Sequence, residues 1–381
     1  MFRYMMTSAL TAAALYSSAG LGFTAENTIG KIETVATFND AMPTGVSVSG
    51  DGRIFVNYPR WGDDVPFTVA EIVDGKAVPY PNAEINKADP SKPAESFLSV
   101  QSVVVDPANR LWILDTAAPG FQAPIAGGAK MVAIDLATNQ IVKTIVFPAD
   151  VILPSTYVND VRFDLRQGKE GVAYLTDSSI TGPGGLIVVD IASGKAFRRL
   201  TGDKTTSPDP TFIPAIDGQK LLNRPKGGKP TPFNVASDGI ALSADGETLY
   251  YSPLSSRHLY SVPAAALREL SISDSDLAKQ SKDWGLKGAS DGLEADDKGR
   301  IYGGDYENHR VRMLENGKWK TIAQNTEIQW PDTFSTGSDG YLYFTVNQLD
   351  RQPGFHEGKG LRKKPYKLLR IRIDAGPVLL K

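Results

Sequence analysis

A pattern that recurs six times restricts the fold of this chain more than any other feature of its sequence. Each unit contains a polar residue, a short strand of alternating apolar residues, a tight turn, and a second strand rich in Tyr, Trp, Phe and Ile. The units run over residues 44–56, 101–114, 159–176, 238–251, 291–302 and 332–344. Most units continue into a second hairpin, as in residues 131–146 and 186–200. Four-stranded units of about 40–60 residues are typical of propeller blades, so the sequence predicts an all-β, six-bladed β-propeller.

The two ends of the chain indicate how the ring of blades closes. The last unit is one strand short, because the chain ends within eight residues of the strand predicted over 366–373. An alternating strand over Ile29 to Phe38 precedes the first unit and has no partner of its own. Closing the ring removes exposed strand edges. We therefore expect this N-terminal strand to complete the last blade.

Three stretches interrupt the repeat. Residues 201–236 form a long segment rich in Pro, Gly and Lys, and loops of that length are usually functional or mobile. Residues 273–283 are predicted as the only helix, with Ser273 as its N-cap and Asp276 three positions later. Residues 350–365 are predicted as a basic loop inside the last blade.

The first 25 residues have the pattern of an export signal. Arg3 is the only charge before Glu26, an apolar stretch follows it, and small residues offer cleavage after Ala19 or Ala25. An uncleaved N-terminal anchor is the alternative. The sequence thus predicts a signal peptide over 1–25, one propeller domain over 26–381, and a periplasmic or secreted location. No other segment is apolar enough to cross a bilayer, so we expect no further membrane contact.

Composition excludes several classes of function. The formal net charge is −2 without a large basic excess, which predicts no nucleic-acid partner. The chain has no cysteine, so disulfides, thiol nucleophiles and zinc–thiolate sites are excluded. Signatures of serine hydrolases, P-loops, zinc proteases and dinucleotide sites are absent, and the three histidines are not paired at ligand spacing. We expect a monomer whose partner is a small molecule.

Aligning the six units brings polar residues to one level of the channel. The first strand of each propeller blade lines the channel, so the residues that begin these strands should form a ring. The ring contains Thr44, Gln101, Asn159, Asp238, Asp291 and Asp332. Converging carboxylates repel unless they are protonated or bridged by a cation, and oxygen ligands suit Ca²⁺ or Mg²⁺. The alternative is that these residues only bond neighbouring backbone amides at strand starts.

Several short runs resemble the major royal jelly/yellow protein family. They are residues 185–190 (GLIVVD), 253–263 (PLSSRHLYSVP), 329–334 (QWPDTF) and 347–349 (NQL). The resemblance extends from about residue 95 to the C-terminus. It implies an exported six-bladed propeller. The family includes proteins linked to dopachrome conversion and others that bind biogenic amines in the channel.

A weaker similarity connects the chain to the gluconolactonase group of propellers. That group holds a divalent cation with one Glu, two Asn and one Asp. Asn159 and Asp291 match an Asn and the Asp of that set, whereas Asp238 stands at the other Asn position and Thr44 at the Glu position. Two of the four identities are therefore kept. From the alignment of the units, the sequence predicts that Asn159, Asp238 and Asp291 bind a divalent cation, with Ca²⁺ as the expected ion.

Two classes of function therefore remain open. In the first, the channel mouth is an enzyme site in which a cation polarises the substrate and Asp160 or Asp332 moves protons, as in lactone hydrolysis or tautomerisation. In the second, the protein binds a small amine or aromatic ligand without turnover, through Gln101, Trp330 and Asp332. A propeller that only binds a protein partner is a third possibility.

Overall fold

The computed structural model describes residues 30–381 and contains six four-stranded antiparallel sheets. Blade one contains β2 (Val46–Val48), β3 (Ile54–Asn57), β4 (Val69–Val73) and β5 (Lys76–Pro79). Blade two contains β6 (Val100–Val105), β7 (Arg110–Asp115), β8 (Lys130–Asp135) and β9 (Gln140–Val146). Blade three contains β10 (Val158–Asp164), β11 (Val172–Asp177), β12 (Gly185–Asp190) and β13 (Ala196–Arg199). Blade four contains β18 (Ser237–Leu242), β19 (Thr248–Pro253), β20 (His258–Pro263) and β21 (Lys282–Leu286). Blade five contains β22 (Leu293–Ala295), β23 (Ile301–Asp305), β24 (Arg310–Glu315) and β25 (Lys318–Gln324). Blade six contains β26 (Pro331–Thr336), β27 (Tyr341–Val346), β28 (Tyr366–Arg372) and β1 (Ile32–Phe38).

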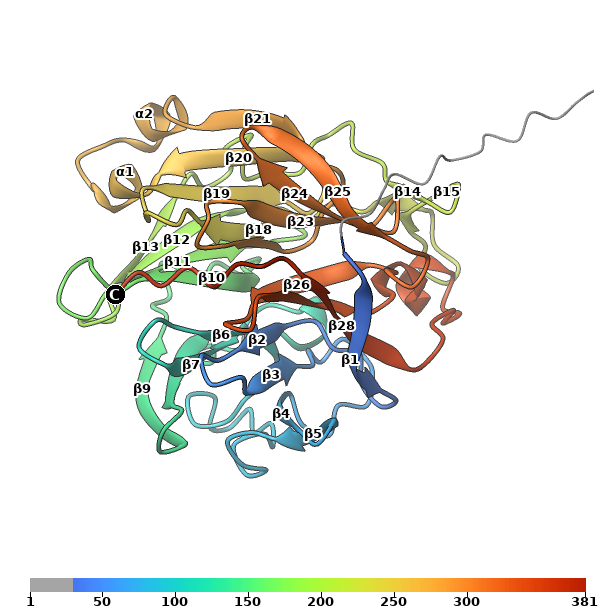
Figure 1. The fold of residues 1–381 in the computed structure, drawn as a ribbon, viewed down its shortest axis with the longest axis horizontal. Helices are drawn as coiled ribbons and strands as arrows, with labels where there is room; N and C mark the ends of the chain where they lie inside the picture. The colour runs from blue at the N-terminus through green and yellow to red at the C-terminus, as the bar shows by residue number, and fades with distance from the viewer. Residues whose placement is uncertain (1–29) are drawn as a thin grey trace, which may run out of the picture.

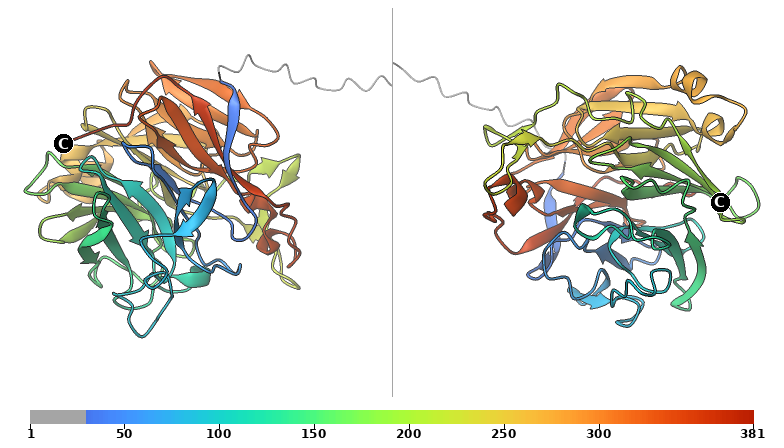
Figure 2. Two further views of the ribbon diagram at one scale, coloured as in Figure 1. Left: turned by 60° about the horizontal axis from the view of Figure 1, so that its bottom comes forward. Right: turned by 180° about the vertical axis from the view of Figure 1, so that it is seen from behind.

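The innermost strands of the six blades are neighbours around a ring. β2 contacts β6, β6 contacts β10, β10 contacts β18, β18 contacts β22, β22 contacts β26, and β26 returns to β2. The blades follow one another around this ring in chain order (Figures 1 and 2). The prediction of a six-bladed propeller is confirmed.

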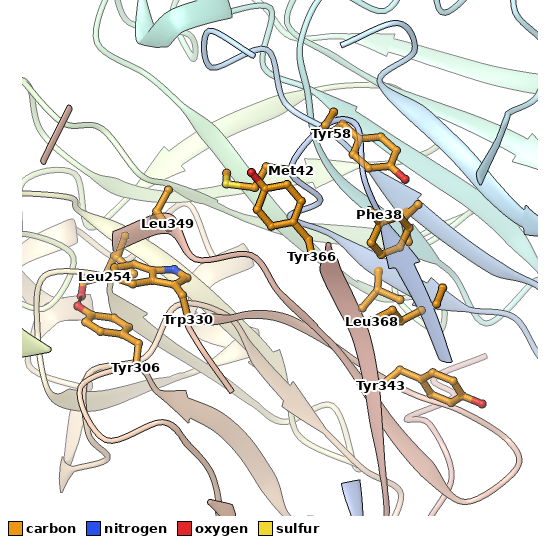
Figure 3. Packing of buried hydrophobic residues seen from close by; sticks show 14 of the residues in the cluster. Phe38, Met42, Tyr58, Leu254, Tyr306, Trp330, Tyr343, Leu349, Tyr366 and Leu368 are labelled. Carbon is orange, nitrogen blue, oxygen red and sulfur yellow. Dashed lines mark hydrogen bonds between the residues drawn. The ribbon is translucent and has the colours of Figure 1, made fainter. Parts of the chain in front are cut away.

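The N-terminal strand closes the ring, as predicted. β1 pairs antiparallel with β28 and forms the outer edge of blade six, from Ile32 opposite Ile371 to Phe38 opposite Tyr366. Phe38 and Tyr366 pack near Tyr58 of blade one, in a cluster that joins the first and last blades (Figure 3). The predicted strand began at Ile29, which lies outside the described residues, as does the predicted signal peptide over 1–25.

The three interruptions of the repeat take distinct forms. Residues 201–236 contain two small hairpins, β14 (Ala215–Ile216) with β15 (Gln219–Lys220) and β16 (Leu222–Asn223) with β17 (Thr231–Pro232). The loop between β27 and β28 contains two 3-10 turns, η2 (Leu349–Arg351) and η3 (Pro353–Phe355), and a third, η1 (Pro119–Phe121), precedes β8. The hairpin β14–β15 and the blade-six loop lie together at the right of Figure 1.

The prediction of a single helix over 273–283 is wrong in extent and in number. The described chain has two short helices, α1 (Ala264–Arg268) and α2 (Asp274–Ala278). Ser273 caps α2 as expected, because its side chain accepts a hydrogen bond from the backbone N–H of Asp276. The segment after α2 forms β21 instead, where Trp284 donates from Nε1 to the Ser261 hydroxyl at 2.9 Å. Pairing with the neighbouring strand outweighs local helix propensity there.

The apolar core lies within and between the blades, so the middle strands are buried on both faces. All six residues of β11 are buried, for example, and Trp112 of β7 is completely inaccessible. Among residues 30–381, no helix has both the length and the apolar character needed to cross a membrane.

Removing β1 should be far more damaging than removing the residues before it. A deletion of residues 1–39 would leave β28 as an unpaired edge and would take Phe38, which is 5% exposed, out of the core. We expect this variant to aggregate or to melt well below the parent protein, whereas deletion of residues 1–27 should leave the melting temperature unchanged. Thermal unfolding and size-exclusion chromatography measure both effects. Equal melting temperatures for the two truncations would contradict the closure.

Candidate functional site

One end of the channel opens into a cavity of about 760 Å³. Its floor contains five of the six predicted ring residues, Gln101, Asn159, Asp238, Asp291 and Asp332, one from each of blades two to six. Loops cover its sides, among them residues 231–235 of the insertion and 352–355 of the blade-six loop. Cavities of this size are typical of small-molecule sites. Thr44 does not line the cavity, and its hydroxyl accepts a hydrogen bond from Asn57 Nδ2 at 2.9 Å.

Irregular strand pairing directs the ring side chains into the channel. The register between first and second strands shifts beside Gln101, at Asn159 and Asp160, at Asp238, and at Asp332. These positions are β-bulges, which bend a strand and re-aim its side chains. The ring residues are therefore displaced from the simple in–out alternation of a regular strand.

Glycines let neighbouring blades come close at the level of the ring. A Cβ on Gly239, next to Asp238, would lie 2.5 Å from the carbonyl oxygen of Asp291. A Cβ on Gly292, next to Asp291, would lie 2.6 Å from the carbonyl oxygen of Asp332. Any larger residue at either position would push the blades apart. These two Asp-Gly pairs therefore allow three carboxyl groups to converge.

Buried aspartates at the ends of second strands position the segments that lead into the ring. Asp115 accepts hydrogen bonds from the backbone N–H groups of Leu98 and Ser99 at 2.7 and 2.9 Å, and it forms a buried ion pair with Lys130. Asp177 similarly accepts from the N–H of Tyr157 at 2.8 Å and pairs with Arg198. These contacts fix the backbone just before Gln101 and Asn159.

Neutral donors satisfy the carboxyl groups of the floor. Asn159 Nδ2 and the Ser178 hydroxyl donate to Asp238 Oδ2 at 2.5 and 2.8 Å. Asn347 Nδ2 donates to Asp332 Oδ2 at 2.6 Å. Among residues 30–381, no ion pair includes any of the three floor aspartates. The cavity therefore has an acidic floor without a side-chain counter-charge in contact.

Burial makes these carboxyl groups hard to ionise. It raises the pKa of Asp291 to about 8, with the nearby charge of Asp332 as the next cause. Burial and the neighbouring Asp291 hold the pKa of Asp238 well above its usual range. Burial and Asp238 do the same for the pKa of Asp332. The close approach of Asp291 is thus one cause of the raised pKa of Asp238.

Aromatic side chains form the walls. Phe121 stacks on both Trp61 and Tyr157, with ring centroids 4.9 and 4.8 Å apart. The Tyr157 hydroxyl accepts from Trp61 Nε1 at 2.7 Å and donates to Gln101 Oε1 at 3.0 Å, which connects this wall to the floor. Phe233 and Phe355 meet edge to face at 5.2 Å elsewhere in the lining. Sequence analysis missed these aromatic residues because they lie in loops outside the repeat.

Trp330 supports the floor from behind. It is fully buried and does not line the cavity, in contrast to its predicted role as a direct ligand contact. Its indole Nε1 donates to Asp291 Oδ2 at 2.6 Å, and its ring stacks on Tyr306 at 3.9 Å (Figure 3). Trp330 thus orients Asp291.

Asp160 lies near Asp332 but outside the cavity lining, and its charge is one cause of the raised pKa of Asp332. Asp160 follows Asn159 directly but does not line the cavity. Its carboxylate accepts from the Ser102 hydroxyl at 2.8 Å and forms an ion pair with Arg162 at 2.8 Å. Both oxygens of Asp160 are thus held by protein groups, which leaves Asp332 as the cavity-lining member of the predicted catalytic pair.

Two of the predicted calcium ligands, Asn159 and Asp238, are hydrogen-bonded to each other in this arrangement. Ca²⁺ takes six to eight oxygen ligands. Asn159 directs its N–H group, and not its oxygen, at Asp238 Oδ2. Within residues 30–381, no group of three or more His, Cys, Asp or Glu is arranged to hold a metal ion.

The raised pKa of Asp291 predicts a specific dependence of stability on pH. An unfolded Asp titrates at about 3.9, so the neutral folded carboxyl contributes most stability below that pH. The contribution is lost as the pH rises towards about 8. Asp291→Asn should therefore gain melting temperature relative to the parent between pH 4 and 8, on the order of a few degrees.

Asp245 supplies a control of opposite sign. It lies in the β18–β19 turn, where a hydrogen bond from Ser243 lowers its pKa. Asp245→Asn should lose stability relative to the parent as the pH rises from about 3 to 5. Melting curves from pH 3 to 9 measure both variants. If Asp291→Asn followed the same course as Asp245→Asn, Asp291 would be ionised in the folded protein.

Comparison with known proteins agrees with this architecture. The sequence profile of the family described as Major royal jelly protein matches residues 98–361. Protein yellow of Drosophila pseudoobscura pseudoobscura is 30% identical over 251 residues, which are 62% of this chain and 42% of that protein. Protein yellow of Drosophila melanogaster is 27% identical over 272 residues, or 67% of this chain and 48% of that protein. The chain thus spans less than half the length of these relatives.

Solved structures show the same fold at low identity. A luciferin-regenerating enzyme superposes with a TM-score of 0.53 at 12% identity, covering 91% of this chain and 97% of its own. A gluconolactonase from Xanthomonas campestris gives 0.53 at 12%, with 91% of both chains covered. A calcium-binding regucalcin from Agrobacterium tumefaciens gives 0.51 at 13%, with 91% and 97% covered. From the profile match, which covers more than half of its length, the chain belongs to the major royal jelly protein family.

Proposed function

We propose that the cavity binds a small organic cation with a flat apolar body. The observation that carries this proposal is the floor of Asp238, Asp291 and Asp332, three buried carboxyl groups that face one cavity and form no ion pair among residues 30–381. The buried Lys287 is the basic neighbour of this floor, and its charge lowers the pKa of Asp291 only in part against burial. A bound cation would supply the missing charge and favour ionisation of these groups.

The walls support a ligand with an aromatic or otherwise flat body. The stacked Trp61, Phe121 and Tyr157 offer ring faces, and cations are attracted to such faces when water is excluded. The cavity of about 760 Å³ would enclose a ligand of one or two rings. Gln101, fixed by Tyr157, adds one oriented amide to the floor.

Proton transfer at the same floor is a second candidate function. An acid–base catalyst works best when its pKa is close to the working pH, and the pKa of Asp291 is raised to about 8. Asp332 is the second cavity carboxyl with a raised pKa. Tautomerisation or lactone hydrolysis would use such a pair, and a gluconolactonase is among the propellers of similar fold.

Calcium is the alternative occupant that the sequence predicted. Its support is the likeness to a propeller described as calcium-binding, which at 13% identity concerns the fold alone. The hydrogen bond from Asn159 Nδ2 to Asp238 Oδ2 favours the organic cation instead, because it turns the donor side of Asn159 toward the predicted metal position.

We also propose that the protein is exported, on the basis of residues 1–25. The first residue of protein recovered from the periplasm or medium should be Gly20 or Glu26, following cleavage after Ala19 or Ala25. N-terminal sequencing tests this. A cytoplasmic protein that retains Met1 would contradict it.

Calorimetric titration with 2-phenylethylammonium tests the binding proposal. We expect saturable binding, with protons released because the floor ionises around the cation, and therefore tighter binding at pH 8 than at pH 5. Asp332→Asn or Asp291→Asn should weaken binding roughly 10- to 100-fold, the range for loss of a charged hydrogen bond. Asp245→Asn, in a turn far from the cavity lining, should bind like the parent.

Two parallel titrations and one conversion assay distinguish the alternatives. Neutral 2-phenylethanol has the same ring, so equal affinity for it would show that charge is not recognised. If CaCl₂ bound and the amine did not, the calcium prediction would replace the organic cation. The conversion assay offers the protein a lactone or a quinoid test compound. If the parent protein turned over either compound and Asp291→Asn did not, the result would favour the proton-transfer candidate.

A further inference from the structure

A second cavity of about 410 Å³ lies beside the first, between the insertion and the blade-six loop. Two segments far apart in the sequence form it. The backbone N–H of Arg224 donates to the Gly354 carbonyl at 2.8 Å, and that of Glu357 donates to the Arg224 carbonyl at 2.9 Å. Phe355 lines both cavities and separates them.

Basic side chains dominate the second cavity. Lys220 and Arg224 line it, and neither forms an ion pair with any residue in the range 30–381. Arg351 also lines it, donates to Gln329 Oε1 at 2.9 Å, and forms long ion pairs of 3.9 Å with Asp217 and Asp350. The acidic members of the lining are Asp217, whose carboxylate is bonded to His309 Nε2 at 2.7 Å, and Asp350. The cavity thus contains unpaired positive charge.

Asp350 supplies a separate indication of a ligand. It is only 8% exposed, and its Oδ2 accepts from Gln329 Nε2 at 2.9 Å. Its Oδ1 is buried and has no hydrogen-bond partner. The neighbouring His356 does not bond to Oδ1, because its Nε2 donates to the backbone carbonyl of Asp350 at 2.9 Å. An unpaired buried acceptor is unfavourable, and a donor on a ligand would recover its hydrogen bond.

We propose that this second cavity binds a small hydroxylated organic anion, such as a sugar acid or a sugar phosphate. Its acid group would lie among Lys220, Arg224 and Arg351, because Arg pairs well with carboxylate and phosphate oxygens. One of its hydroxyl groups would donate to Asp350 Oδ1. The site is independent of the cation proposed for the first cavity, since the two floors share no charged residue.

Titration with four probes tests the two parts of this recognition separately. Gluconate and glucose 6-phosphate carry both an anion and hydroxyl groups, inorganic phosphate carries the anion alone, and glucose carries hydroxyl groups alone. We expect gluconate or glucose 6-phosphate to bind at least fivefold more tightly than inorganic phosphate, and glucose not to bind. Binding of glucose 6-phosphate but not of gluconate would identify a phosphate ligand. Binding of gluconate but not of glucose 6-phosphate would identify a carboxylate ligand.

Matched variants locate the site. Arg224→Met should weaken binding at least tenfold, whereas Lys226→Met, in the same hairpin loop but outside the lining, should have no effect. Asp350→Asn should turn the Oδ1 position into a donor while the new side-chain oxygen still accepts from Gln329. It should weaken binding of the hydroxylated anions at least fivefold and leave inorganic phosphate unchanged.

Several outcomes would overturn the proposal. Equal losses in Arg224→Met and Lys226→Met would show attraction to surface charge in general. Inorganic phosphate that bound as tightly as the hydroxylated anions, or a complete absence of binding at millimolar concentration, would also contradict it. Asp291→Asn should leave this binding unchanged, so failure of the first-cavity proposal is distinguishable from failure of this one.

Discussion

Pairing of β1 with β28 joins the two ends of the described chain in a single sheet, and the channel depends on it. The innermost strands of the six sheets surround one common axis only if the first and last blades are joined. Closure also places Phe38 and Tyr58 in contact, so that blades one and six share one apolar cluster. Without this contact the floor residues of blades two to six would have no fixed common centre.

The floor of the first cavity buries polar side chains that are more stable in water. Carboxyl groups at 4–6% exposure are costly to ionise, and three of them converge here. Neutral donors such as Asn159, Ser178 and Asn347 offset this cost. Local departures from ideal structure of this kind are expected at functional sites, where the rest of the fold compensates. The buried cores of the blades supply that compensation.

Most of the architecture was predictable because propeller blades are local units. Each hairpin is specified by its own alternating strands and turn residues, and six similar units have one natural arrangement. The ring positions followed from aligning the units, and five of the six do line the cavity. Alignment could not decide the roles of Asp160 and Trp330. A bulge at Asn159 and Asp160 separates the directions of these two side chains, and a left-handed backbone at Trp330 accompanies an indole that points to Asp291 from behind.

The amino-acid sequence by itself determined the number of blades, their closure and the ring of polar residues, because these depend on patterns within about 60 residues and on the unpaired strands at the two ends. Tertiary structure alone decided what surrounds the ring. The aromatic walls come from loops without a repeat. That no Lys or Arg of residues 30–381 forms an ion pair with the floor depends on where those side chains fold. The second cavity needs Arg224 beside Gly354. Such contacts between distant segments are set by packing of the whole ring, and no local pattern encodes them.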